Sequence, residues 1–266
     1  GVAFIEGGWP GANPKDAAFF ARARDLAWTH AVVTAFGATR RVGTACEDDE
    51  NLKALLEAGT QACTLVGKTW PLHVTEVLRT TLDDNLAIIE ESVRYMRAQG
   101  RRVVYDAEHF FDGVKADRPY ALECLKAAAR GGAEALVLCD TNGGSLPWDI
   151  EATVREVAAA LGPQGPRLGV HCHNDTDAAV ANSLAGVRGG ARHVQGTING
   201  YGERCGNANL CAVIPNLELK LGHPCLPEGA LKRLAEVSRF VAEIANQAPD
   251  DYMAYVGRNA FAHKGG

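Results

Sequence analysis

The sequence predicts an α/β protein of the (β/α)8, or TIM-barrel, class that lacks its first βα unit within these 266 residues. Apolar runs rich in β-branched residues recur roughly every 25–40 residues, and an amphipathic stretch of helical period follows each, which is the repeat of alternating strands and helices. Polar residues follow nearly every predicted strand, as they do where strand ends share one barrel mouth. No GxGxxG motif follows the first strand, and an open sheet would gather its site at one switch point instead.

Seven strands are predicted, whereas a closed barrel of this class has eight. The predicted strands are nearly continuous in apolar residues, which is typical of parallel strands covered on both faces. The chain opens directly on a strand and stops in a predicted loop, so we expect a barrel that is open along one side. Either the missing strand lies outside these residues, or the native protein fills the gap in another way. The strands are predicted at residues 3–6, 31–36, 63–66, 103–106, 135–139, 168–171 and 193–197, and helices at residues 16–26, 82–99, 120–130, 148–161 and 175–187.

Composition narrows the class of protein. Hydrophobic residues make up 47% and charged residues 22% of the chain, which is ordinary for a globular enzyme. The net charge of −5 and the absence of a long Lys/Arg run argue against a nucleic-acid partner. No apolar run is long enough to span a membrane, and the opening residues read as a strand, so we expect no secretory leader. Eight scattered cysteines without CxxC spacing indicate free thiols in a cytoplasmic protein.

Two parts of the chain are predicted to differ in role. Residues 1–222 are expected to form the catalytic barrel, from its second to its eighth strand. Residues 223–266 are expected to form a helical extension that begins a linker or further subdomain.

Residues 169–175 (GVHCHND) place two histidines at the end of a predicted strand. Side chains two residues apart in a strand point to the same side, so His171 and His173 should both face the barrel mouth. Two such imidazoles can bind one cation, with Asn174 or Asp175 orienting them from behind. The alternative is a structural pair bonded to loop backbone. The pairing and its position favour metal binding.

A glycine-rich segment, residues 200–209 (GYGERCGNAN), follows the last predicted strand. Its glycines permit positive φ angles and a close approach to a ligand, and the run after it is helical in pattern. An amide at the start of that helix could supply an oxygen ligand. A plain turn explains the glycines equally well.

Acidic and hydroxyl side chains end two further strands. In residues 105–113 (YDAEHFFDG), Asp106 and Glu108 alternate onto one face, where a carboxylate can position a substrate or relay a proton. The alternative is two solvated loop acids. At the end of the next strand, Thr141 could bind a ligand carboxylate, whereas Asp140 could simply cap a turn.

Five segments together resemble the isopropylmalate/homocitrate synthase family of metal-dependent, Claisen-condensing TIM barrels. These segments are IEGGWPG, YDAEHFFDG, LCDTNGG, VHCHND and QGTINGYGERCGNANL, and they extend over nearly the whole chain in the family's order. The DAEHFFDG and GGWPG segments favour the members that condense acetyl-CoA with pyruvate.

The resemblance implies a role for each candidate residue. His171 and His173 match the family's metal-binding histidines, and Asn207 matches an asparagine that approaches the same cation. Glu108 matches a glutamate near the bound 2-oxo acid, and Thr141 a threonine that contacts its carboxylate. Glu6 matches a catalytic carboxylate at the end of the family's second strand. Asp106 is expected to contact the substrate because it shares a face with Glu108, and not because of the resemblance.

Two elements of the family pattern are absent from these residues. The family's first strand, in a segment resembling DTTLRDG, supplies an Asp ligand and an Arg. A histidine just beyond an AFAHKGG-like stretch acts across a dimer interface, and His263 is not that residue. We therefore expect the 266-residue chain alone to be weakly active or inactive, and the full-length protein to be a homodimer.

The implied reaction joins acetyl-CoA to a small 2-oxo acid, pyruvate, with Mg²⁺, Mn²⁺ or Zn²⁺ as the cofactor, in branched-chain amino-acid biosynthesis. Isopropylmalate or homocitrate synthesis on the same barrel would also fit the motifs. The volume of a pocket around Phe36, Leu65, Tyr105 and Asp106 would discriminate between these oxo acids. A metal-dependent lyase would fit them too, as would an inactive fragment that keeps the barrel.

Overall fold

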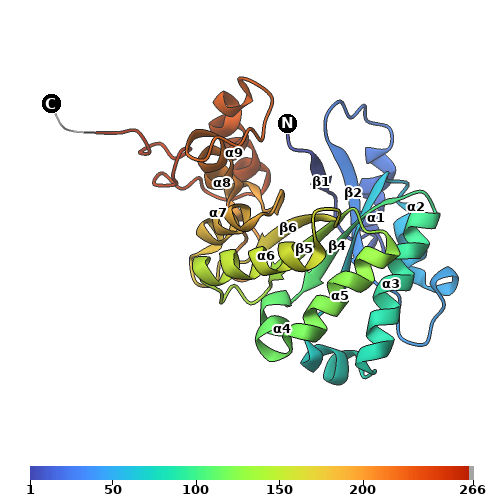
Figure 1. Ribbon diagram of the computed structural model, residues 1–266. Coiled ribbons are helices and arrows are strands. Elements are labelled where there is room, and N and C mark those ends of the chain that lie inside the picture. Colours follow the sequence, from blue (N-terminus) through green and yellow to red (C-terminus); the bar gives the residue numbers. More distant parts are fainter. Residues whose placement is uncertain (264–266) are drawn as a thin grey trace.

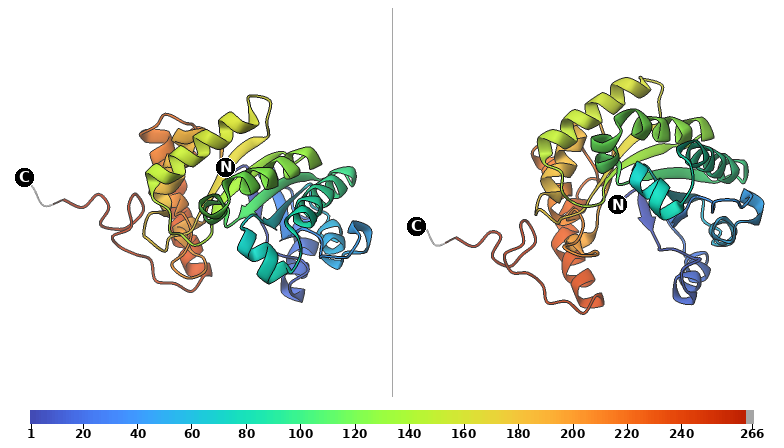
Figure 2. Two further views of the ribbon diagram at one scale, coloured as in Figure 1. Left: turned by 60° about the horizontal axis from the view of Figure 1, so that its bottom comes forward. Right: turned by 90° about the horizontal axis from the view of Figure 1, so that it is seen from below.

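A curved sheet of seven parallel strands forms the centre of the molecule, in a computed structural model that describes residues 1–263 (Figure 1). Each strand pairs with the next along the chain, in the order β1 to β7. Seen from below, the sheet curls around a lumen and the helices lie outside it (Figure 2). The open TIM barrel expected from the sequence is confirmed. The strands are β1 Phe4–Glu6, β2 Val32–Ala38, β3 Ala62–Lys68, β4 Arg102–Glu108, β5 Ala135–Asp140, β6 Arg167–Cys172 and β7 His193–Gln195.

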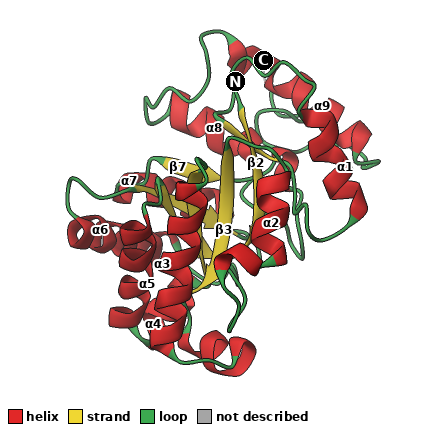
Figure 3. Cartoon of the chain, turned by 90° about the vertical axis from the view of Figure 1, so that its right-hand side faces the viewer, coloured by secondary structure: helices red, strands yellow, loops and turns green. Residues whose placement is uncertain are grey.

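The outer layer consists of helices whose starts are set by local signals. Asp49 caps α2 by accepting hydrogen bonds from two backbone N–H groups, and Asn13 and Thr81 cap α1 and α3 by accepting from one N–H group each. Figure 3 shows the helices around the strands. The helices are α1 Pro14–Ala23, α2 Glu50–Glu57, α3 Leu82–Ala98, α4 Phe110–Ala116, α5 Arg118–Gly131, α6 Pro147–Leu161, α7 Ala179–Gly189, α8 Leu210–Leu219 and α9 Leu234–Ile244, with a π-helical turn at His73–Leu78 and 3-10 turns at Cys46–Asp48, Ile198–Gly200 and Ala230–Arg233.

Alternate residues of each strand face opposite layers of the molecule. On β4, Tyr105 belongs to the large hydrophobic cluster between sheet and helices. Its neighbour Val104 belongs to a small separate cluster with Val137 and Cys139 of β5. Because side chains alternate along a strand, the small cluster faces the lumen and forms its floor. Polar residues on the same face, further along each strand, lie at the mouth.

The two edge strands, β1 and β7, are not hydrogen-bonded to each other in the described chain. They approach each other nonetheless, because the rings of Phe4 on β1 and His193 on β7 have centroids 5.8 Å apart. Arg102 lies over the Phe4 ring, with its Cζ 4.9 Å from the ring centroid. An aromatic contact therefore spans the open side of the barrel at the amino ends of the strands.

The segment after residue 222 packs on the last loops of the barrel. Leu234 of α9 and Val256 form a small buried cluster with Cys211 of α8. Asn199 donates a hydrogen bond to the Ser238 backbone of α9, at 2.9 Å. The predicted domain boundary at residue 222 stays a prediction, and residues 264–266 of the predicted extension lie outside the described residues.

One helix starts later than the sequence pattern predicts. Helix α7 begins at Ala179 and not at residue 175, because residues 174–178 form a turn. Asn174 accepts a hydrogen bond from the Ala179 N–H at 3.1 Å, and Asp177 takes the left-handed conformation with φ 57°. The turn leaves the residues after the histidine pair free to contact other loops.

Two sequence expectations about the chain as a whole can be compared with its described part. Within residues 1–263, no helix combines the length and apolarity needed to cross a membrane. All eight cysteines, every one of which falls in this range, are free thiols.

Candidate metal and substrate site

His171 and His173 point their Nε2 atoms at each other from the end of β6. The two nitrogens are 3.2 Å apart. At a metal–nitrogen distance of about 2.1 Å, two ligands of one cation lie about 3.0 to 3.4 Å apart, depending on whether the site is octahedral or tetrahedral. The shared orientation predicted from their spacing is confirmed, and their separation fits two ligands of one ion.

Gln195, the last residue of β7, bonds to the far side of the His171 ring. Its Oε1 lies 2.6 Å from His171 Nδ1. The expectation that Asn174 or Asp175 would orient the pair is wrong. Asn174 caps the turn before α7, and Asp175 pairs with Arg204. Both side chains follow the strand end and turn away with the loop, whereas Gln195 lies beside His171 on the adjacent strand.

Asn207 reaches the same point from the glycine-rich loop. Its Nδ2 is 3.0 Å from His171 Nε2, and a backbone bridge pairs residue 207 with His173. The amide nitrogen faces His171. A half-turn of the amide plane, which exchanges two nearly isosteric atoms, would present the oxygen instead. The loop thus brings the predicted third ligand to the histidine pair.

The surroundings keep both imidazoles uncharged near neutral pH. Burial, followed by the neighbouring His171 and Arg204, lowers the pKa of His173 to about 4. Burial also lowers the pKa of His171, against the opposing hydrogen bond to Gln195. Neutral imidazoles have a free lone pair, which is the form that binds a cation.

The donor set suits a divalent cation but is small. Within residues 1–263, no group of three or more His, Cys, Asp or Glu side chains is placed to hold a metal ion. Two imidazoles and one amide are therefore the candidate ligands among these residues. His173 Nδ1 is buried without a hydrogen-bond partner in the described chain, and its nearest carboxylate oxygen, Glu203 Oε1, is 3.8 Å away. The His173 ring therefore contacts the rest of the site mainly through Nε2, the atom that faces His171.

Two acids line the lumen beside the histidines. Asp106 is 4% exposed and accepts a hydrogen bond from Gln195 Nε2 at 2.9 Å, so it is not a solvated loop acid. Burial, and then the charge of Glu6, raise the pKa of Asp106 well above its usual range. Burial inside the lumen also raises the pKa of Glu6, although its side chain stays reachable by solvent and the Thr64 hydroxyl opposes the shift.

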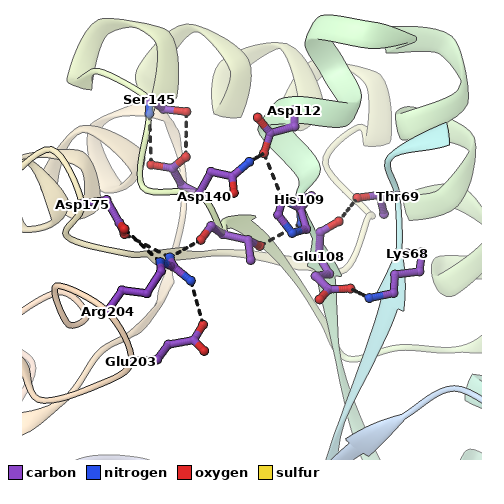
Figure 4. Close-up of polar contacts among 12 residues, drawn as sticks. Lys68, Thr69, Glu108, His109, Asp112, Asp140, Ser145, Asp175, Glu203 and Arg204 are labelled. Atoms are coloured by element: carbon purple, nitrogen blue, oxygen red, sulfur yellow. Dashed lines mark hydrogen bonds and ion pairs between the residues drawn. The ribbon is translucent and has the colours of Figure 1, made fainter. Parts of the chain in front are cut away.

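Glu108 ends β4 on the same face as Asp106, as the alternation predicts. Its carboxylate forms an ion pair with Lys68 from the end of β3 (Figure 4). Thr69 donates to the Glu108 backbone carbonyl at 2.5 Å. The two charged side chains are each about one quarter exposed, so the pair lies at the mouth and not in bulk solvent.

Thr141 and Asp140 have different roles at the end of β5. The Thr141 hydroxyl accepts a hydrogen bond from the His109 N–H at 2.9 Å. Asp140 points into the helix layer, where Ser145 donates to it from both its hydroxyl and its N–H (Figure 4). The capping interpretation of Asp140 is confirmed, and Thr141 remains the residue available to a ligand.

Arg204 fastens the glycine-rich loop to the histidine loop. Its guanidinium makes two hydrogen bonds to Asp175, at 2.8 and 3.0 Å, and one to the Thr141 carbonyl, at 2.5 Å (Figure 4). Figure 4 also shows Glu203 beside it. The loop that carries Asn207 is therefore tied to the ends of β5 and β6.

Some site residues were missed from the sequence, and two were misplaced. Gln195 and Lys68 were given no role, although each ends a strand of the observed sheet and polar strand ends were the signal for the other residues. Leu65 and Tyr105 were expected around the oxo-acid pocket. Both are fully buried in the cluster between sheet and helices, because they have the opposite alternation from Asp106.

Fold and site together define the class: an open TIM barrel whose polar side chains gather at the carboxyl ends of its strands. A family model described as HMGL-like matches residues 1–241, so the chain belongs to the HMGL-like family.

Individual relatives agree with this assignment. The whole chain is 55% identical to an (R)-citramalate synthase from Synechocystis sp., of which it spans half the length. It is also 34% identical to a 2-isopropylmalate synthase from Sulfolobus acidocaldarius. This match covers the whole of the present chain and 65% of that protein. The structure of a hydroxymethylglutaryl-CoA lyase from Pseudomonas aeruginosa has the same fold, with a TM-score of 0.73 at 16% identity over 91% of this chain and 80% of that one.

Proposed function

We propose that the protein containing this chain is an acyltransferase that condenses acetyl-CoA with pyruvate and, after water hydrolyses the thioester, gives (R)-citramalate and CoA, in branched-chain amino-acid biosynthesis. The observation that carries the proposal is the identity of 55% to an (R)-citramalate synthase along the entire chain, against 34% to a 2-isopropylmalate synthase. The reaction is assigned to the whole protein, because the chain spans about half the length of that citramalate synthase.

A divalent cation, Mg²⁺, Mn²⁺ or Zn²⁺, would be held by the two Nε2 atoms of His171 and His173 and by the amide of Asn207. Mixed nitrogen and oxygen donors suit all three ions. When bound, the cation would polarise the keto group of the oxo acid and stabilise the negative charge that develops on its oxygen.

Thr141 is proposed to hold the carboxylate of the oxo acid. Its oxygen already accepts the His109 N–H, so its own hydroxyl proton is free to be donated toward the lumen. Asp106 would contact the same substrate from the neighbouring strand. The lumen floor of Val104, Val137 and Cys139 is apolar and closely packed, which suits a methyl group better than a longer chain.

Glu108 and Glu6 are proposed to handle protons. Glu108 would accept or relay the proton of the acetyl methyl group, while the ammonium of Lys68 offsets the negative charge beside it. Glu6 approaches from the opposite side of the lumen, and its raised pKa brings its proton exchange closer to neutral pH. The two acids would thus act on opposite sides of one reacting centre.

We further propose a cytoplasmic homodimer as the native form of the full-length protein. The eight free cysteines support a reducing compartment. The family resemblance of the sequence supports the dimer.

Thiol release from acetyl-CoA by the full-length protein tests the reaction. With pyruvate we expect a kcat/KM at least about tenfold above that with 2-oxoisovalerate, because a small pocket excludes added methyl groups. The product should be the R enantiomer of citramalate. A preference for 2-oxoisovalerate or 2-oxoglutarate would contradict the proposal, as would cleavage of a 3-hydroxyacyl-CoA without any condensation.

A further inference from the structure

We infer that Gln195 is a positioning residue that keeps the ring proton of His171 on Nδ1, so that Nε2 faces the proposed cation with a free lone pair. The inference rests on the metal site proposed above. Gln195 ends β7 between two lumen side chains, with His171 on β6 at one end of its amide and Asp106 on β4 at the other. The distances are 2.6 Å from Oε1 to His171 Nδ1 and 2.9 Å from Nε2 to Asp106 Oδ1.

The orientation of the Gln195 amide sets the arrangement of hydrogen atoms in the three groups. Its NH₂ group faces Asp106, where a carboxyl oxygen accepts from it. The amide oxygen then faces His171 and can only accept. A hydrogen bond forms there only if His171 carries its proton on Nδ1, which leaves Nε2 with a lone pair.

The lone pair on Nε2 is the one that the site needs, because Nε2 is the atom that faces His173 and Asn207. If the amide were reversed, its NH₂ group would donate to Nδ1, and the ring proton would move to Nε2, where it would exclude a cation. His173 has no equivalent partner in the described chain, since its Nδ1 makes no hydrogen bond. Of the two histidines, only His171 has its ring proton positioned by a side chain of the described chain, and that side chain is Gln195.

Variants of the full-length protein test this. Gln195→Leu removes both hydrogen bonds at similar volume, whereas Gln195→Glu keeps an acceptor for Nδ1–H and can share a proton with Asp106. Gln61→Leu makes the same chemical change at an exposed site before β3 and serves as the control. Affinity for Zn²⁺ and Mn²⁺ alone is measured by competition with a chromophoric chelator. We expect Gln195→Leu to bind each ion about 10- to 100-fold more weakly, with Gln195→Glu and Gln61→Leu within about threefold of the unsubstituted protein.

A second measurement needs no variant at the glutamine. Long-range ¹H–¹⁵N spectra of the metal-free, histidine-labelled protein report which ring nitrogen is protonated, and the signals of His171 are those missing from a His171→Gln sample. We expect the proton on Nδ1, and we expect Gln195→Leu to lose this preference. This spectrum decides the matter if Gln195→Leu does not fold.

The outcomes separate the two proposals. Wild-type ion affinity in a folded Gln195→Leu protein, or a His171 proton on Nε2 in the unsubstituted protein, would overturn the inference and leave the metal site intact. Failure of the unsubstituted protein to bind Zn²⁺ or Mn²⁺ would overturn the metal site, and this inference with it.

Discussion

The histidine pair makes the clearest prediction for a single residue. Replacing His171 or His173 by Ala removes one of two imidazole ligands, and we expect the affinity of the full-length protein for Mn²⁺ to fall at least about a hundredfold, since even outer partners of ligands are worth 10- to 100-fold. Isothermal titration with Mn²⁺ measures the change. His223→Ala alters an exposed histidine on the loop after α8 and should bind as the unsubstituted protein does. Equal affinity in all three variants would show that His171 and His173 are not ligands of the ion.

Thr141 tests the substrate half of the site. Thr141→Val keeps the shape of the side chain and removes the hydroxyl, so we expect the KM for pyruvate to rise about tenfold or more, as the loss of a hydrogen bond to a charged group predicts. The kcat should change less. Thr141→Ser retains the hydroxyl and should restore a KM within a fewfold, and Thr75→Val on the exposed π-helical turn should be neutral. A change in kcat alone would contradict carboxylate binding.

At the scale of residues, the sequence was informative where chemistry is carried by spacing. The alternation of Asp106 with Glu108, and of His171 with His173, was sufficient to place each pair on one face. Gln195 could not be identified in this way, because an amide has no spacing signature and its role depends on two other strands. Asn174 and Asp175 were misassigned because they follow the end of the strand. Beyond that point, residues next to the histidines in sequence need not lie beside them in space.

Among the elements, the glycine-rich loop is the most restrictive. Gly206 has φ +94°, and a Cβ there would lie 2.1 Å from the Gly200 carbonyl oxygen. Gly206→Ala should therefore lower the free energy of unfolding by about 1–3 kcal/mol and displace Asn207, which also weakens Mn²⁺ binding. Urea unfolding measures the first effect.

Gly43→Ala is the matched control for that loop. Gly43 also has a positive φ, +73°, but its Cβ would meet nothing within 4 Å. We expect a smaller loss of stability there and unchanged ion affinity. Equal ion affinity in both variants would show that the position of Asn207 does not matter.

Helix α2 depends on its cap. Asp49 is 1% exposed, and its carboxylate accepts from the N–H groups of Asn51 and Leu52 at 3.0 Å each. Asp49→Ala should reduce the free energy of unfolding by about 1–2 kcal/mol, measured by urea denaturation. Asp83→Ala removes an exposed first-turn acid of α3 that does not act as its cap, and should change stability by less than about 0.5 kcal/mol.

Elements with a long periodic pattern were predicted closely, and short ones were not. Helix α3 was expected at residues 82–99 and spans Leu82–Ala98. Helix α4 was not predicted, because its seven residues are too few to establish a period and His109 precedes it in a left-handed conformation. The start of α7 was misjudged since the turn at residues 174–178 is polar, like the first turn of a helix.

For the whole molecule, stability should depend on the cation. An ion that binds only the folded protein, at a concentration 100-fold above its dissociation constant, adds about 2.7 kcal/mol to the free energy of unfolding. We expect Mn²⁺ or Zn²⁺ to raise the melting temperature of the full-length protein by a few degrees. The double variant His171→Ala, His173→Ala should melt at one temperature with or without the ion. An equal rise in that variant would place the ion elsewhere.

The architecture as a whole could be predicted because the βα repeat and the polar strand ends are both periodic signals. Which strand ends meet across the lumen could not, because the contact between Asp106 on β4 and Gln195 on β7 depends on how tightly the sheet curls. The predicted oxo-acid pocket shows the limit, since Leu65 and Tyr105 were grouped with Asp106 by proximity in sequence and lie on the other side of the sheet.

The division of each strand between two layers sets how the protein tolerates change. Along β4, substitutions at Val103, Tyr105 and Ala107 should reduce cellular abundance, because these side chains fill the layer under the helices. Substitutions at Asp106 and Glu108 should leave abundance high but abolish growth on a medium where the cells must make the product themselves. A saturation-mutagenesis survey that scores both abundance and growth should therefore find that abundance is sensitive at one position and growth alone at the next, alternately along the strand.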